Sequence, residues 1–225
     1  MIKTLFMLLS LDGKISTGYS DERDFDKDLP NIPGIKEGVG QYDDLEQQTD
    51  LYSFNTGKVM AKVGWNEPKE TINKIPVTFV LVDNKPHLTK LGIENLLKRC
   101  EALVIATTNN EHPSLSVQND RLTTLTYDGS IDLRDMFDKV EKMGADRITL
   151  QSGGEMNAVL LRNGLIDELS VVVAPMLVGG RTTPTLIDGE ALLTQEDLTQ
   201  VKALELIEAK TLDNSFLHLR YVVKN

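Results

Sequence analysis

The chain has 225 residues and a formal net charge of −10, with 40% hydrophobic and 26% charged residues. This hydrophobic content is enough for a sizeable core, and no apolar run approaches the roughly 20 residues of a membrane span. The negative charge disfavours a surface for nucleic acid or for an anionic membrane, while a local cluster of donors can still hold an anionic substrate. We therefore expect neither nucleic acid nor a membrane as a partner.

Strand and helix signals alternate along the whole chain without a linker-like stretch, so the sequence predicts one domain over residues 1–225. The N-terminal apolar run passes directly into Asp12 without a small-residue cleavage site, which indicates a buried first strand of a cytoplasmic protein and not a signal peptide. Cys100 is the only cysteine and is expected to be buried and inert. The three histidines are scattered without other ligands at metal-binding spacing, so no metal site is expected.

The predicted strands are short apolar or β-branched runs bounded by turn residues. They cover residues 2–9, 50–55, 76–82, 102–107, 122–127, 147–151, 168–174, 201–210 and 215–223. Helical spacing predicts helices over 41–48, 92–99, 131–143 and 155–162. The continuous apolar run 171–174 is typical of a strand buried on both faces, and the last two strands form a hairpin around Asp213-Asn214. The fold class predicted is α/β, with a mostly parallel sheet and an antiparallel C-terminal hairpin.

Two loops near the N-terminus are candidates for ligand contact. The first strand leads into the turn Asp12-Gly13, which at the carboxyl edge of a sheet can cover a ligand, although spacing alone favours an ordinary hairpin turn. Residues 17–40 form a long, polar and acidic connection, typical of a lid, a binding loop or a disordered segment. Its alternating charges indicate a solvated face and lack the pattern of a calcium loop.

The turn Gly57-Lys58 follows the second strand. A lysine at such a position can meet a phosphate as a point charge, and a solvent-exposed lysine without a ligand is the alternative interpretation.

Residues 147–180 form a strand–helix–strand unit whose first turn is the glycine pair Gly153-Gly154. Glycine lets the backbone approach a ligand, and the free N–H groups of the following helix then face it, which suits a pyrophosphate. A tight turn without a ligand is the alternative. The helix is expected to place Met156, Val159 and Leu160 on one side and to end before Gly164.

These segments together resemble the reductase domain of bacterial riboflavin biosynthesis, which has the three-layer dihydrofolate reductase-like fold. The resemblance rests on residues 9–15 (LSLDGKI), the glycine pair, residues 164–169 (GLIDEL), Ala174-Pro175 and residues 177–180 (LVGG). The chain begins at the reductase and lacks the His/Cys zinc signature of the deaminase domain that precedes it in bifunctional relatives.

The resemblance implies hydride transfer from NADPH to a phosphoribosylamino-pyrimidine, a phosphorylated small molecule whose ribose becomes a ribityl chain. It also implies a homodimer. The residues to which it gives a role are Ser152, Gly153, Gly154, Glu155 and Met156 at the cofactor pyrophosphate, Gly57 and Lys58 at the adenosine 2′-phosphate, Ile15, Ser16 and Thr17 at the nicotinamide, and Asp12 at the substrate end.

Three positions depart from the family pattern. Ser152 stands where a glutamate is usual, Phe6 stands where a lysine is usual, and Asn66-Glu67-Pro68 replaces Asp-Asn-Pro. Each lost group is polar and substrate-facing in the family, so the changes suggest another substrate or another way of holding the same one. The alternatives are a reductase of the same fold acting on another pyrimidine, a pterin or a small carbonyl compound, and a nucleotide-binding protein without turnover.

Overall fold

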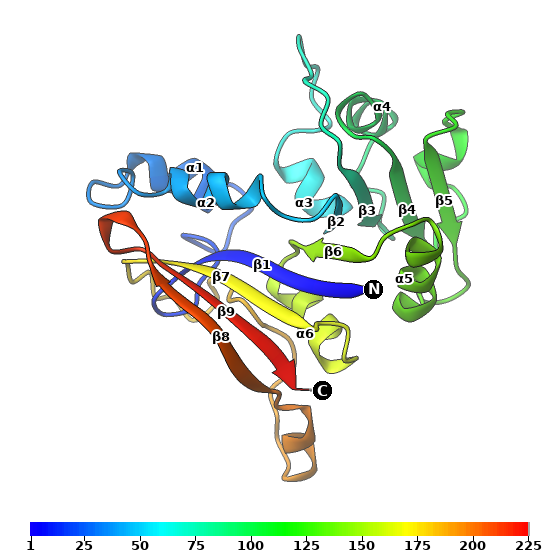
Figure 1. Cartoon of the computed structure of the whole chain (residues 1–225). Coiled ribbons are helices and arrows are strands. Elements are labelled where there is room, and N and C mark those ends of the chain that lie inside the picture. The colour runs from blue at the N-terminus through cyan, green and yellow to red at the C-terminus, as the bar shows by residue number, and fades with distance from the viewer. Residues whose placement is uncertain (225) are drawn as a thin grey trace. The chain divides into compact units, whose positions relative to one another are not determined.

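The computed structural model describes residues 1–224 as an α/β protein with two compact units (Figure 1). Unit 1 comprises Met1 and residues 50–152, and unit 2 comprises residues 2–49 and the chain from residue 153 onward. The single domain expected over residues 1–225 stays a prediction. Within the described residues, every helix is too short or too polar to cross a bilayer.

Unit 1 is built on five parallel strands in the order β5-β4-β3-β2-β6. The strands are β2 (Tyr52–Thr56), β3 (Thr78–Val82), β4 (Leu103–Thr107), β5 (Leu122–Thr126) and β6 (Arg147–Leu150). The helices are α3 (Gly57–Lys62), α4 (Lys90–Arg99) and α5 (Leu133–Lys142), with a 3-10 turn η2 (Pro113–Ser116).

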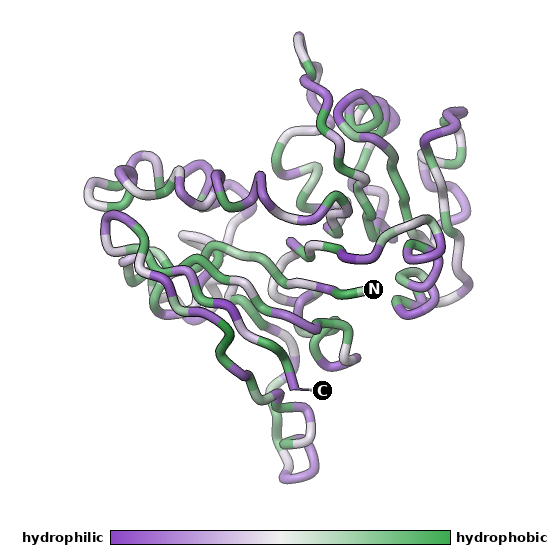
Figure 2. The backbone as a smooth tube through the Cα atoms, in the orientation of Figure 1, coloured by the Kyte–Doolittle hydropathy of each residue, from purple (hydrophilic) through white to green (hydrophobic). Residues whose placement is uncertain are grey.

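Helices cover both faces of the unit 1 sheet. Leu81 and Ile105 are register partners on β3 and β4, and they pack in one cluster with Leu96 of α4. On the opposite face Phe54 of β2 meets Phe137 of α5, with ring centroids 5.5 Å apart. The sheet is therefore the middle of three layers, and the buried strands β3 and β4 are hydrophobic along their length (Figure 2).

Unit 2 contains parallel and antiparallel strands in the order β1-β7-β9-β8. They are β1 (Ile2–Ser10), β7 (Glu168–Ala174), β8 (Ala203–Thr211) and β9 (Leu217–Lys224). Helical segments are α1 (Phe25–Asp28), η1 (Leu29–Asn31), α2 (Gly40–Glu46), α6 (Gly154–Arg162), η3 (Glu196–Gln200) and η4 (Asp213–Ser215). The predicted α/β class, with parallel strands and an antiparallel C-terminal hairpin, is confirmed.

Residues 17–40 are more structured than their composition indicates. They contain α1 and η1, and they bury Phe25, Leu29 and Ile35 against Phe6 and Val172 of the unit 2 sheet. The charged positions between them stay mostly exposed, as predicted. The segment is therefore a polar cover with three apolar anchors and not an unstructured connection.

Two local predictions were wrong. The expected turn at Gly57-Lys58 is the start of α3, which Thr56 caps by accepting a hydrogen bond from Val59 N. On α6 the buried face consists of Gly154, Asn157, Ala158 and Leu160, while Val159 is 44% exposed. The apolar spacing misplaced this face because a buried polar residue, Asn157, belongs to it.

Candidate functional site

The turn after β1 is organised by Asp12. Its carboxylate accepts hydrogen bonds from Ser10 Oγ (2.6 Å), Val178 N (3.1 Å) and Gly179 N (2.7 Å). The hydroxyl of Ser10 and these two backbone N–H groups lower the pKa of Asp12 to about 2. Gly13 adopts a left-handed φ of 78°, which closes the turn. Asp12 is therefore an anion that ties the β1 turn to the loop after β7.

A second connection, residues 183–188 and here named the strap, joins the β1 turn to the start of α6 within unit 2. Hydrogen bonds to other parts of unit 2 hold the strap on both sides of Thr185, which forms a β-bridge with Lys14. The hydrogen bonds are Lys14 Nζ to Thr183 O (3.0 Å), Ile15 N to Pro184 O (3.1 Å), Leu186 N to Gly13 O (3.0 Å), Asn157 Nδ2 to Leu186 O (2.9 Å) and Asp188 N to Gly154 O (3.0 Å). The strap thus brings Ile15 and Gly154, two predicted cofactor residues, to one connected framework.

The two glycines before and within α6 differ in their surroundings. A Cβ on Gly154 would lie 2.2 Å from Asp188 Oδ2 and 2.3 Å from Thr185 O, so this glycine is required by the strap. A Cβ on Gly153 would meet nothing within 4 Å, and the residue has an extended φ of −70° and ψ of 160°. Open space therefore lies beside Gly153, the N-cap of a nine-residue helix, and the N-cap has no side chain to occupy it.

This geometry fits a cofactor phosphate. The N-terminus of a helix favours an anion, because its first N–H groups and the positive end of the dipole face outward. Ser152 precedes this turn and is buried, while Glu155 is exposed and Met156 is half-buried. Of the two glycines predicted at the pyrophosphate, Gly153 is the one with open space beside it that a ligand could use.

Ser16 and Thr17, predicted at the nicotinamide, bond inward to the segment that follows them. Ser16 Oγ donates to Gly18 O and Arg23 O, both at 3.0 Å, and Thr17 Oγ1 donates to Asp28. Among the contacts that lower the pKa of Asp28, the hydrogen bond from the Thr17 hydroxyl has the largest effect. An open pocket of about 580 Å³ is lined here by Thr17, Arg23, Asp28, Asn31 and Ile32.

In unit 1, Gly57 and Lys58 begin α3 at the carboxyl end of β2. Gly57 is buried and Lys58 is exposed. Asp83 follows β3, the strand beside β2, and its carboxylate fills the place of a Cβ on Gly57. The predicted 2′-phosphate turn is thus packed against a buried acid.

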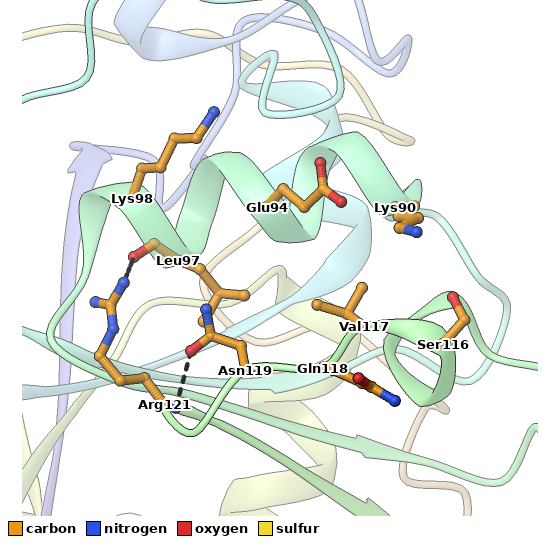
Figure 3. Close-up of a pocket in the computed structure, with 9 residues that line it drawn as sticks. All are labelled: Lys90, Glu94, Leu97, Lys98, Ser116, Val117, Gln118, Asn119 and Arg121. Carbon is orange, nitrogen blue, oxygen red and sulfur yellow. Dashed lines mark hydrogen bonds between the residues drawn. The ribbon is translucent and has the colours of Figure 1, made fainter.

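The pocket in Figure 3 lies elsewhere in unit 1 and contains none of the predicted site residues. It has a volume of about 470 Å³ between α4 and residues 116–121. Arg121 turns back onto the helix, where its guanidinium donates to Leu97 O (2.6 Å). We therefore do not assign the functional site to it.

Sequence patterns did not reveal the acid Asp83, the strap acid Asp188 or the buried Asn157. Asp83 had a usable signal, because it directly follows a buried strand at the edge where ligands bind. The bonds from Asp188 N to Gly154 O and from Asn157 Nδ2 to Leu186 O join residues about 30 positions apart, and no local spacing encodes these two bonds.

Comparison with known proteins now identifies the family. The sequence family described as RibD C-terminal domain matches residues 3–217. The chain belongs to this family. RibD is a riboflavin biosynthesis protein, and another curated relative of the chain is named as a reductase.

A curated relative that matches the chain nearly end to end is named as a reductase. The chain is 27% identical to the 2,5-diamino-6-ribosylamino-4(3H)-pyrimidinone 5′-phosphate reductase of Methanothermobacter thermautotrophicus, over 96% of this chain and 95% of that protein. It is 33% identical to riboflavin biosynthesis protein RibD of Actinobacillus pleuropneumoniae over a shorter region, 34% of this chain and 21% of that one.

Solved structures show the same fold. Acinetobacter baumannii RibD matches with a TM-score of 0.68 and 15% identity, over 100% of this chain and 58% of the longer RibD chain. The yeast riboflavin biosynthesis reductase Rib7 matches with a TM-score of 0.60 and 12% identity, over 99% and 90% of the two chains. The predicted resemblance to the riboflavin-pathway reductase and its fold is confirmed.

Proposed function

We propose that the protein is an NADPH-dependent reductase that acts on a ribosylamino-pyrimidine 5′-phosphate, in the manner of the riboflavin-pathway enzymes. The observation that carries the proposal is the end-to-end match to the archaeal reductase, which leaves few residues of either chain uncovered. As a pathway enzyme it is placed in the cytoplasm. From the same family resemblance we propose a homodimer.

The protein's main contribution to this reaction is to position the cofactor and the substrate relative to each other. NADPH, when bound, supplies the hydride that adds to the carbon of the open-chain imine. The imine nitrogen takes a proton from water or from a nearby acid. Asp12 is not that acid near neutral pH, because its lowered pKa keeps it ionised. Its role is to hold the loop at Val178 and Gly179, while the strap holds the backbone of Ile15, which we propose to line the nicotinamide.

The two phosphate sites are proposed on different elements. The pyrophosphate binds at the N-terminus of α6, where the open space beside Gly153 leaves room for it. The 2′-phosphate meets Lys58 at the start of α3, where an exposed ammonium group acts as a point charge. This second contact is the basis for the proposed preference for NADPH, because NADH lacks the 2′-phosphate.

The variants Gly153→Asp and Gly153→Asn test the pyrophosphate site. Both side chains have the same size, and both are good N-caps for α6, so neither should lower the unfolding midpoint. Only the aspartate adds a negative charge beside the phosphate, and we expect its NADPH Kd to exceed that of the asparagine variant about tenfold or more. Calorimetric titration of the pair measures this difference. Equal affinities of the two variants for NADPH would show that the pyrophosphate does not bind at the N-terminus of α6.

Two of the three departures from the family pattern, Phe6 and Asn66, have structural roles in this chain. Phe6 is buried and stacks on Tyr42 at 4.9 Å between ring centroids. Asn66 accepts from Thr89 N (2.9 Å) and donates to His87 O (2.8 Å), which fixes the start of α4. Neither side chain is available to replace the lost substrate contacts, so another substrate stays the second candidate.

Turnover with a substrate panel separates the candidates. NADPH oxidation is followed with 2,5-diamino-6-ribosylamino-4(3H)-pyrimidinone 5′-phosphate, with 5-amino-6-(5-phosphoribosylamino)uracil, with a pterin and with dihydrofolate. We expect turnover with an aminopyrimidine phosphate. Turnover with the pterin or dihydrofolate alone would favour the second candidate, and cofactor binding without turnover of any compound would indicate a nucleotide-binding protein.

A further inference from the structure

Asp83 is a buried carboxylate at the carboxyl end of β3, with 1% of its surface exposed. Four donors hold it. Its Oδ1 accepts from His87 N (3.1 Å) and lies 2.9 Å from His87 Nδ1, and its Oδ2 accepts from Leu88 N (3.0 Å) and lies 3.1 Å from His112 Nε2. Two histidines that are far apart in the sequence therefore converge on one acid.

The hydrogen bonds of His112 orient its ring, with Nε2 facing Asp83. The backbone N–H of Ser114 donates to His112 Nδ1 (3.1 Å), so this nitrogen carries no proton. The ring proton then resides on Nε2 and is donated to Asp83. His112 is also buried, at 1% exposure. It is thus a ring N–H donor behind the carboxylate, held in place by the 3-10 turn η2 that it caps.

Burial raises the pKa of Asp83, but the hydrogen bonds from His112, Leu88 and His87 outweigh it, and the pKa lies below its ordinary value. The group is therefore ionised at neutral pH. An amide in its place would turn one of the two accepting oxygens into a donor, which would then oppose an N–H group.

Asp83 and Gly57 are in close contact. A Cβ on Gly57 would lie 2.2 Å from Asp83 Cγ and 2.5 Å from both carboxylate oxygens. Gly57 does not have a left-handed φ, so its conformation alone does not demand glycine. The carboxylate occupies the space of the missing side chain, and so it sets how closely the start of α3 approaches β3.

We propose that Asp83, held by His87 and His112, is a positioning residue that fixes the start of α3 at Gly57 and Lys58 for binding of the cofactor phosphate. The proposal rests on the proposed function, in which Lys58 meets the 2′-phosphate of NADPH. Asp83 itself is buried and acts through the start of α3: when its geometry changes, the backbone of Gly57 and the base of Lys58 move with it.

The variant Asp83→Asn tests this proposal, with Asp50→Asn as the matched control. Asp50 is a half-buried acid at the opposite, amino end of β2, where it accepts from Thr149 Oγ1 (2.9 Å) and Arg147 Nε (3.2 Å). Each change removes one hydrogen-bonded carboxylate beside the same sheet and should lower the unfolding midpoint. Only Asp83→Asn should raise the NADPH Kd, by about tenfold, while kcat at saturating NADPH changes little.

Outcomes distinguish this proposal from the proposed function. Suppose that wild type binds NADPH and that neither Asp83→Asn nor Asp50→Asn changes the Kd for NADPH. Asp83 is then only structural, and the positioning role is overturned. If wild type binds no NADPH, both the proposed function and the positioning role are overturned. Urea unfolding of each variant confirms that Kd is measured on folded protein.

A double-mutant cycle covers the case in which Asp83→Asn does not fold. Gly57→Ala should weaken NADPH binding, because its Cβ collides with the carboxylate. Shortening the acid in Gly57→Ala/Asp83→Ser makes room for that Cβ, so the two losses should not add. Additive effects on the NADPH Kd would show that the two residues do not act through each other and would overturn the proposal.

Discussion

Asp12 keeps a constant negative charge over the pH range in which activity would be measured. A group whose pKa is lowered to about 2 takes up a proton only as the pH falls toward that value, so Asp12 stays anionic between about pH 5 and pH 8. Asp12→Asn places an amide nitrogen against Val178 N or Gly179 N, and the loop they belong to should shift. We expect kcat/KM to fall about tenfold, with no change in the shape of its pH profile.

The pH dependence of kcat/KM for wild type and Asp12→Asn measures this directly. Asp12 would instead be a titrating catalytic acid if an inflection of the wild-type profile in this range were absent from the variant.

Residue roles were predictable from the sequence only where the pattern is local. The buried Cys100 was predicted from its apolar neighbours, and burial raises the pKa of its thiol to about 11. Gly164 was predicted at the end of α6 and has a φ of 64°. The convergence of His87 and His112 on Asp83 was not predictable, because the fold and not the spacing joins residues from two loops.

The strap and α6 form one packed element pair, and the two glycines should respond differently to alanine. Gly154→Ala pushes a methyl group into Asp188 and the backbone of Thr185, and overpacking of this kind costs about 1–3 kcal/mol. Gly153→Ala enters open space and loses only the better N-capping of glycine, so we expect a smaller loss of unfolding free energy, below about 1 kcal/mol.

Urea unfolding of both alanine variants checks this difference. Equal losses of stability would mean that the strap does not press on Gly154. Because Gly154 is already required by packing, a substitution there does not report on the cofactor, and Gly153 is the position for that test.

Elements with a strong period or a long apolar run were predicted, and short ones were missed. Strands β3, β4 and β7 are continuous apolar runs and were predicted in place. The six-residue α3 was read as a turn, since its apolar residues are too few to show a helical period. In residues 17–40 the many charges hid three apolar side chains whose partners lie on distant strands.

At the scale of the whole molecule, the assembly state is the main open prediction. In unit 2, β8 lies at the edge of its sheet, and all nine of its residues are exposed, including Leu206 and Ile207. Proteins protect such edges, and a second copy of the chain can do so. We expect light scattering to give twice the chain mass of 25.0 kDa. A mass of one chain at every concentration tested would contradict the homodimer.

The central claim is that the chain binds NADPH in preference to NADH, and a titration of wild-type protein with each cofactor tests it most directly. Trp65, the single tryptophan, lies just after α3 and reports through its fluorescence. We expect a saturable change in fluorescence with NADPH, at a Kd clearly below that of NADH. If neither cofactor changes the fluorescence and calorimetry also detects no binding, the reductase assignment is contradicted.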